Sequence, residues 1–349
     1  MHDTTDLASG LLTRDFENTM RNINRSKCFA ALAASSSLLG ATVASANGSS
    51  VLFIRGAERS GGFLESGSDA DRTEQLADIN NGSTSRGNHG WKTLADTLRD
   101  DGFTVNQWIE PLEANAPATG GTTGLGIDFT QTDLSPYDVI VFGSNNGVYT
   151  DASVDVIENY IRGGGGAIFI SDANFGGDWA DASNSDQQFL SRFGLIAHQD
   201  RGTYSISGSD LLIPDHPLLE GVDRFDGEGV TPIRVGELAE GVEVEILANA
   251  EGQTRLNEGD LGNLNIGPSR NAGPNDAALL AATIDEGRLV GHFDRNTFFN
   301  LNGAGTNITR FDNEQLALNI FRFTSVPEPG TATLVIAAAL AIAGRRRRA

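Results

Sequence analysis

Short apolar runs alternate with amphipathic helical patterns through the middle of the chain, and this alternation limits the fold more than any other feature. Strand-length runs occupy 51–54, 103–105, 137–143, 167–170 and 288–293, and looser strands are expected at 242–248 and 278–284. Helical spacing of apolar residues occurs at 90–101, 151–162, 187–193 and 313–323. Strands that alternate with helices in this way predict an open, mostly parallel sheet with helices on both faces.

The clearest strand–helix–strand unit runs from residue 137 to residue 170. Thr150 is expected to cap the helix that follows the first strand, and glycines 163–166 are expected to end that helix before the next strand. Consecutive glycines also occur in phosphate-binding loops. Here, however, they precede a strand, and no Gly-Lys-Ser/Thr sequence opens a helix after them. We therefore predict a helix stop with a close turn into the sheet.

The first 46 residues have the layout of an export leader. A basic region is followed by a mostly small and apolar stretch at 28–43 and by the cleavage-site pattern Ala44-Ser45-Ala46. Residues 1–19 contain several acids, which suit no leader, so Met20 is the expected start and 20–46 the expected signal peptide. The basic region consists of Arg21, Arg25 and Lys27.

The last residues, 326–349, also read as a targeting segment. A helix over 326–344 would span about 28 Å, which is barely enough to cross a bilayer. A cluster of arginines follows directly and would hold this end in the cytoplasm by the positive-inside rule. The segment opens with Pro327, Glu328 and Pro329, and the terminal cluster is Arg345, Arg346, Arg347 and Arg348.

The Pro-Glu-Pro triplet, apolar span and arginine cluster together resemble the PEP-CTERM sorting signal of Gram-negative bacteria that make exopolysaccharide. The resemblance implies signal peptidase and an exosortase as processing partners, with transient anchoring in the inner membrane. The product would then be exported to the cell surface or extracellular matrix, in association with exopolysaccharide. An ordinary C-terminal membrane anchor is the alternative.

Cys28 is the only cysteine and lies in the predicted leader. The exported protein is therefore expected to have no disulfide, no thiol nucleophile and no cysteine-bound metal. The histidines of the body form no paired zinc-binding motif, and we predict no cofactor. The histidine before Pro217 is instead expected to cap a turn. These histidines are His89, His198, His216 and His292.

Acidic residues crowd one loop and form a weak calcium candidate. Asp69 and Asp71 would be its first ligands, with Glu74 and Asp78 close by. The calcium-loop pattern needs an oxygen ligand at its fifth place and glycine at its sixth, and this loop lacks that glycine. We therefore predict no metal site of this type.

The chain is strongly acidic, with 46 acidic against 25 basic residues and a formal net charge of −21. Such a protein is repelled by nucleic-acid phosphates and anionic lipid, which excludes nucleic acid as a partner. Adaptation to salty water, a plain solubilising surface and cation binding from a matrix remain as explanations of the charge.

The body, residues 47–325, is expected to be one α/β domain. Four of its stretches resemble the class I glutamine amidotransferase-like superfamily, including trehalose-utilisation-type members. They are D-V-I-V-F-G at 138–143, G-G-G-A-I-F-I-S-D at 164–172, H-P-L-L-E-G-V at 216–222 and the run at 287–300. The resemblance implies a flavodoxin-like sheet. Catalytic members carry a cysteine where this chain has Ser171, so thiol-dependent glutamine hydrolysis is excluded.

Several residues near the expected strand ends are candidate site residues. Ser171, His292 and Asp294 are the parts of a serine nucleophile, base and orienting acid. Asp172 and Asp294 are expected at carboxyl ends of parallel strands, where open α/β sheets bind ligands. Trp179, in the polar stretch 176–185, would be an exposed platform for a sugar ring, whereas Trp91 and Trp108 fit core positions.

Two classes of function follow from these features. The first is an exported, exopolysaccharide-associated surface or matrix protein whose amidotransferase-like domain binds a ligand or partner without catalysis. The second is a secreted serine-dependent hydrolase that acts on carbohydrate or ester substrates. The missing cysteine and the sorting tail favour the first class.

Overall fold

The computed structural model describes residues 48–56, 76–111, 125–145, 147–172, 182–197, 203–250, 273–303 and 305–325. The signal-peptide prediction, with Ala44 and Ala46, and the whole sorting tail lie outside these residues. So do Trp179 and the calcium candidates Asp69 and Asp71. In the part that is described, no helix combines the length and apolar character needed to cross a bilayer.

Five neighbouring parallel strands form one half of a nine-stranded sheet in the described chain. Their spatial order is β2-β1-β3-β4-β11, which is 2-1-3-4-5 when they are numbered along the chain. This is the flavodoxin-like order, and it agrees with the predicted parallel sheet. The strands are β1 (Ser50–Arg55), β2 (Thr104–Ile109), β3 (Val139–Ser144), β4 (Gly166–Ile170) and β11 (Gly287–His292).

The other half of the sheet is antiparallel, which corrects the expectation of a mostly parallel sheet there. β10 (Asp276–Ile284) and β11 are joined only by Asp285 and Glu286, and Ile284 pairs with Gly287. A parallel crossover needs a dozen or more residues, so this link permits only a hairpin. The remaining strands of this half are β9 (Val242–Asn249), β8 (Ile233–Val235) and β5 (Leu195–Ala197).

Several short elements have no clear pattern in the sequence and were not predicted. β6 (Thr203–Ser207) and β7 (Arg224–Glu228) form a separate antiparallel pair. His216 caps the turn at 217–219 as predicted, because its Nδ1 accepts a hydrogen bond from the Leu218 N–H at 3.1 Å. The 3-10 turns are η1 (Phe129–Gln131), η3 (Ser191–Phe193), η4 (Gly208–Asp210), η5 (Pro217–Leu219) and η6 (Asn296–Phe298).

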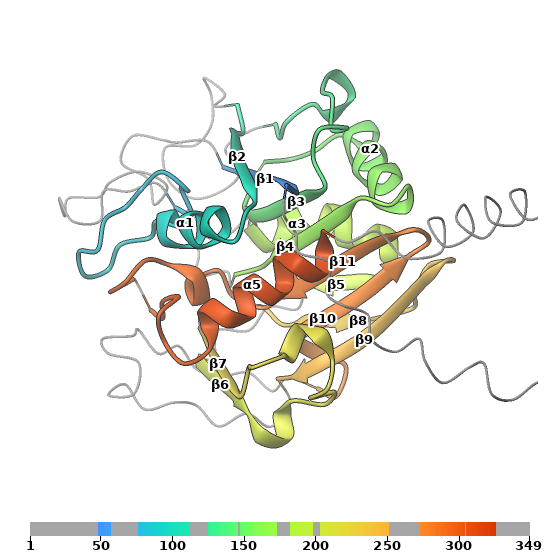
Figure 1. The fold of residues 1–349 in the computed structure, drawn as a ribbon. Helices are drawn as coiled ribbons and strands as arrows, with labels where there is room; N and C mark the ends of the chain where they lie inside the picture. Colours follow the sequence, from blue (N-terminus) through green and yellow to red (C-terminus); the bar gives the residue numbers. More distant parts are fainter. Residues whose placement is uncertain are drawn as a thin grey trace, which may run out of the picture. The chain divides into compact units, whose positions relative to one another are not determined.

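Helices cover both faces of the parallel half, as predicted (Figure 1). α1 (Lys92–Asp100) and α5 (Asn313–Thr324) pack on one face with Phe53 of β1 and Ile168 of β4. α2 (Asp151–Arg162) and α3 (Ala182–Leu190) pack on the other face. Alternate residues of each strand therefore enter different apolar clusters, and this alternation decides where the strand-end side chains point.

The unit from β3 to β4 forms as the sequence predicts. The Thr150 side chain accepts a hydrogen bond from the Ser153 N–H at 3.2 Å, and α2 ends at Arg162 with Gly163 as its C-cap. Gly164 has a φ of +104°, which favours glycine. A Cβ atom at Gly166 would lie 2.4 Å from the backbone oxygen of Thr324, so this turn lets α5 approach the sheet closely.

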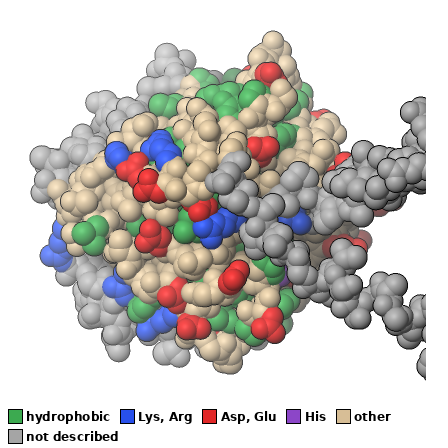
Figure 2. All heavy atoms as spheres, in the orientation of Figure 1, with side chains coloured by type: hydrophobic (Ala, Val, Ile, Leu, Met, Phe, Trp, Pro, Cys, Tyr) green, Lys and Arg blue, Asp and Glu red, His purple; other side chains and the backbone are tan. Residues whose placement is uncertain are grey.

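Acidic and basic side chains are interspersed on the face shown in Figure 2. Arg192 lies 2.9 Å from Asp155, and Arg162 lies 2.9 Å from Glu158 one helical turn away. Pairs at the surface, where water screens the charges, contribute at most about 1 kcal/mol each. The acidic composition is therefore carried by a mixed surface in this view, not by a continuous acidic patch.

Candidate functional site

Polar side chains gather at the carboxyl ends of the parallel strands, where open α/β sheets bind ligands. We call this group the strand-end cluster. Each of its members is less than 9% exposed, which is unusual for charged residues unless they are paired. The cluster comprises Glu110, Asn145, Ser171, Asp172, Asp186, Glu228, His292, Asp294, Arg295 and Asn296.

Ser171 lies directly after β4 and has no exposed surface. Its hydroxyl donates to the Asp186 carboxyl of α3 at 3.1 Å. Burial raises the pKa of Asp186 to about 8, although hydrogen bonds from Asn145 and Ser171 lower it in part. Near neutral pH this carboxyl is therefore mainly protonated.

The predicted triad of Ser171, His292 and Asp294 is not assembled. His292 pairs in register with Ile170, the last residue of β4, so Ser171, the next residue along the chain, points to the opposite face of the sheet. Ser171 meets α3 on one face, whereas the His292 ring lies among Phe225 and Phe298 on the other, with centroid distances of 5.8 and 4.9 Å.

His292 is a buried neutral imidazole. Its Nδ1 lies 2.8 Å from the backbone oxygen of Asp294 and also 3.2 Å from the Asp294 backbone nitrogen, so the tautomer decides whether Nδ1 donates to the oxygen or accepts from the N–H. Burial lowers the pKa of His292 to about 3. Its Nε2 accepts no hydrogen bond from any described residue. The imidazole is therefore held by the backbone of Asp294 and not by its carboxylate.

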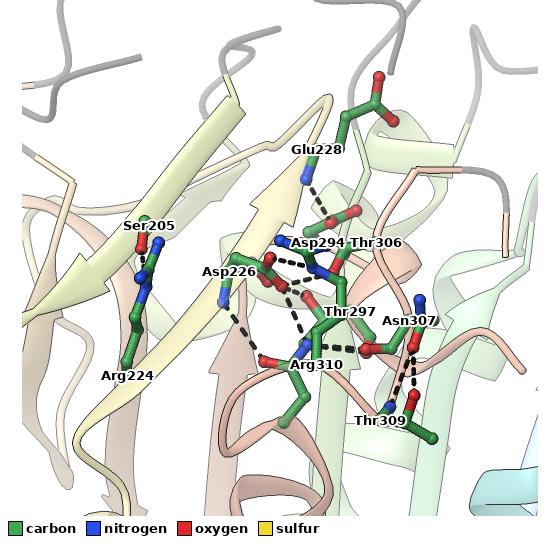
Figure 3. Close-up of polar contacts among 11 residues, drawn as sticks. Ser205, Arg224, Asp226, Glu228, Asp294, Thr297, Thr306, Asn307, Thr309 and Arg310 are labelled. Carbon is green, nitrogen blue, oxygen red and sulfur yellow. Dashed lines mark hydrogen bonds and ion pairs between the residues drawn. The ribbon is translucent and has the colours of Figure 1, made fainter. Parts of the chain in front are cut away.

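Asp294 joins β7 to the segment after β11 (Figure 3). One of its carboxylate oxygens accepts from the backbone N–H of Glu228 at 2.7 Å. The other accepts from the backbone N–H of Asn296 at 2.9 Å. The Asn296 amide in turn donates to the Glu228 carboxyl at 2.8 Å. Burial, with the nearby charge of Asp172, raises the pKa of Asp294 well above its usual range and the pKa of Glu228 to about 8.

The Asp172 carboxylate forms a buried ion pair with the Arg295 guanidinium. The Asp172 backbone oxygen also accepts from the Thr231 hydroxyl at 2.6 Å, and the indole N–H of Trp91 donates to the Arg295 backbone at 3.3 Å. These contacts fix the ends of β4 and β11 side by side. Trp91 is buried in the core, as predicted, and Trp108 is half-buried.

Asp226 of β7 anchors the segment that follows the cluster (Figure 3). Its carboxylate accepts hydrogen bonds from Thr306, from the Asn313 amide at 2.9 Å and from the Arg310 guanidinium at 2.9 Å. Its backbone oxygen accepts from the Thr297 hydroxyl at 2.7 Å. The residues from 297 to 313 are thereby tied to the strand that carries Glu228.

Glu110 follows β2 and occupies the far side of the cluster. Both of its carboxylate oxygens lie 3.1 Å from the Gly147 N–H, and the Tyr149 hydroxyl donates to one of them. Burial and the Glu110 charge raise the pKa of Tyr149 well above its usual range. Glu110 was missed in the sequence although it follows a strand just as Asp172 does. The predicted strand ended at residue 105, whereas β2 runs to Ile109, so the strand-end rule did not reach Glu110.

A surface hollow of about 610 Å³ lies beside the cluster, between α2 and α3. Its lining is mostly polar, and Tyr149 connects it to Glu110. Across the residues described, no three or more His, Cys, Asp or Glu side chains are arranged to hold a metal ion. The hollow is lined by Tyr149, Asp151, Val154, Asp155, Gln188, Ser191 and Arg192.

No family model matches the chain, and no curated protein is similar to it. Similar solved structures include a ThuA-like protein from Parabacteroides merdae, with 11% identity and a TM-score of 0.45 over 80% of this chain and 91% of that one. Another is a ThuA-like protein from Bacteroides uniformis, with 15% identity and a TM-score of 0.42 over 79% and 91%. A protein from Salmonella typhimurium named as cytoplasmic has 15% identity and a TM-score of 0.42 over 78% and 98%.

Proposed function

We propose that the chain is an exported, exosortase-processed surface or extracellular-matrix protein whose amidotransferase-like domain binds a ligand or partner without catalysis, in association with exopolysaccharide. The leader pattern ending at Ala46 and the Pro-Glu-Pro, apolar and arginine tail support export and sorting. The strand-end cluster, at the edge where open α/β sheets bind ligands, is the proposed binding region.

The hydrogen bond of Ser171 carries the non-catalytic part of the proposal. A serine hydroxyl becomes nucleophilic only when an adjacent base removes its proton. The described hydrogen-bond partner of the Ser171 side chain is Asp186, which has a pKa of about 8 and is mainly protonated at pH 7, whereas His292 lies on the opposite face of the sheet. Ser171 therefore acts as a hydrogen-bonding residue that joins β4 to α3.

A fluorophosphonate probe tests this reading on the full chain. We expect no covalent adduct at Ser171 between pH 6 and pH 7, where Asp186 is mainly protonated, measured by peptide mass spectrometry, and no turnover of ester or glycoside panels. Ser171→Ala is the specificity control for any labelling, and Ser153→Ala is a matched buried serine away from the cluster. A single adduct at Ser171 that disappears in His292→Ala would overturn the proposal.

The alternative is a secreted serine-dependent hydrolase that acts on carbohydrate or ester substrates. One observation favours it, because the buried Nε2 atom of His292 has no hydrogen-bond partner among the described residues. For this atom to act as the base for Ser171, the serine side chain would have to move from one face of the sheet to the other. The probe experiment distinguishes the two functions directly.

A further inference from the structure

The outer edge of β2 is open in the part of the chain that the structure describes. β2 ends the sheet, and its pairing partner is β1. The Thr104 and Glu110 N–H groups donate to Ser49 and Arg55 at 2.9 and 2.8 Å, so even-numbered residues of this strand face β1. Backbone groups alternate in direction along a strand. The N–H groups of Val105, Gln107 and Ile109 therefore face outward, and no described residue accepts from them.

β2 itself carries no charged side chain, although the chain has 46 acidic and 25 basic residues, and the one described carboxylate bonded to this strand's side chains is the buried Asp78, which accepts from the Gln107 amide at 3.1 Å. β2 reads Thr-Val-Asn-Gln-Trp-Ile, and Ile109 is 49% exposed. Natural sheets usually protect an open edge with charges, proline or a bulge. The opposite half of the sheet shows such protection, because Glu243 and Glu245 lie on β9, where the Leu212 N–H also donates to the Leu247 oxygen at 2.8 Å.

The sequence of the edge is complementary to itself. If two copies of β2 lie antiparallel about a two-fold axis at Gln107, Val105 of each copy faces Ile109 of the other. The outward residues then exchange N–H and C=O groups in hydrogen-bonded pairs, and apolar side chains meet across the axis. A closed two-fold contact of this kind uses the same patch on both copies and stops at a dimer.

We propose that β2 pairs with β2 of a second copy and joins the two sheets into one continuous sheet. This inference is independent of the proposed function. Each chain has a net charge of −21, so two copies repel each other in most orientations. The uncharged edge is the strip along which their backbones can approach with the least repulsion. Added salt shortens the range of the remaining repulsion and should strengthen the dimer.

Sedimentation velocity on the full chain tests the dimer, at 20 mM and at 500 mM sodium chloride. We expect a concentration-dependent dimer that is favoured at the higher salt. Ile109→Glu places a charge on the edge of β2 and should abolish the dimer. Ile196→Glu is the matched control, because Ile196 is 44% exposed on β5 in the other half of the sheet. This control should leave the dimer unchanged. Circular dichroism verifies that both variants are folded.

Amide hydrogen exchange locates the contact. Exchange at Val105, Gln107 and Ile109 should slow as protein concentration rises and should stay fast in Ile109→Glu. A monomer at every concentration and salt would overturn the proposal. So would a dimer that survives Ile109→Glu, one that Ile196→Glu dissociates equally, or one that leaves exchange at these amides unchanged.

Discussion

Glu228→Gln should stabilise the domain at high pH, because Glu228 is a carboxyl group that the fold keeps protonated. Its pKa rises from an ordinary value of 4.5 to about 8, mainly through burial and also through the charge of Asp172. Between these values the unfolded chain releases the proton while the folded chain retains it. The free energy of unfolding therefore falls as pH rises, by about 1.4 kcal/mol per pH unit for this group. The contribution is fully present below pH 4.5 and is lost by about pH 8.

From pH 5 to pH 8 this group should lower the free energy of unfolding by about 4 kcal/mol. Glutamine has nearly the same shape, retains an oxygen for the Asn296 amide, which donates at 2.8 Å, and cannot ionise. We expect Glu228→Gln to match the native protein at pH 4.5 and to exceed it by about 3–5 kcal/mol at pH 8.

Urea unfolding at pH 5, 6.5 and 8 measures this difference. Glu243→Gln is the control, because it makes the same chemical change at an exposed position of β9. That variant should follow the native protein across the whole range. If native and Glu228→Gln stabilities change in parallel with pH, Glu228 is not protonated in the folded state and our account of the cluster is wrong.

Three further predictions concern other parts of the chain. Asp226→Ala should lower the free energy of unfolding by about 3–5 kcal/mol, measured in urea, because it removes the buried carboxylate that accepts from the Arg310 guanidinium, the Asn313 amide and the Thr306 hydroxyl. His292→Phe should make the free energy of unfolding less dependent on pH below pH 6.5, measured by urea unfolding. In the native protein the pKa of His292 is about 3 when folded and near 6.5 when unfolded, so its contribution to stability is present above pH 6.5 and falls as pH drops towards 3. Intact-mass analysis of protein from the native surface should show a product that begins at Asn47 and ends near Pro327, and a stable product that keeps its arginine tail would contradict the sorting proposal.

The parallel half of the fold was predictable because its strands are buried on both faces. Such strands form continuous apolar runs, like 139–142 and 167–170, which can be recognised in the sequence before the neighbouring strands are known. The antiparallel half was harder. β5 and β8 are short and mixed in polarity, and β6 and β7 include serine, arginine and aspartate. The link at Asp285 and Glu286 was readable as a hairpin, since it is too short for a parallel connection.

The sequence could predict where the site lies in the fold, but not which of its side chains contact one another. Ser171, Asp172 and Asp294 follow buried strands, and the structure brings all three to the strand-end cluster. Their relative faces depend on the register between β4 and β11, strands far apart in sequence. A shift of one residue exchanges the faces, so the sequence cannot tell whether Ser171 meets His292 or Asp186. Asp186 and Glu228 were missed because nothing in a helix or a short edge strand marks a carboxyl as one that will be buried.

The position of α5 at the end of the domain has a consequence for the order of folding. Its residues Leu316, Ile320 and Phe321 complete the apolar cluster over β1, and the Phe321 ring lies 5.8 Å from that of Phe53. Nearly the whole domain must therefore leave the ribosome before this face of the sheet is covered. Contacts between distant parts of a chain also form slowly, because a long loop must close first. Native packing of this face of the sheet consequently waits for α5 and cannot accompany synthesis of the earlier strands.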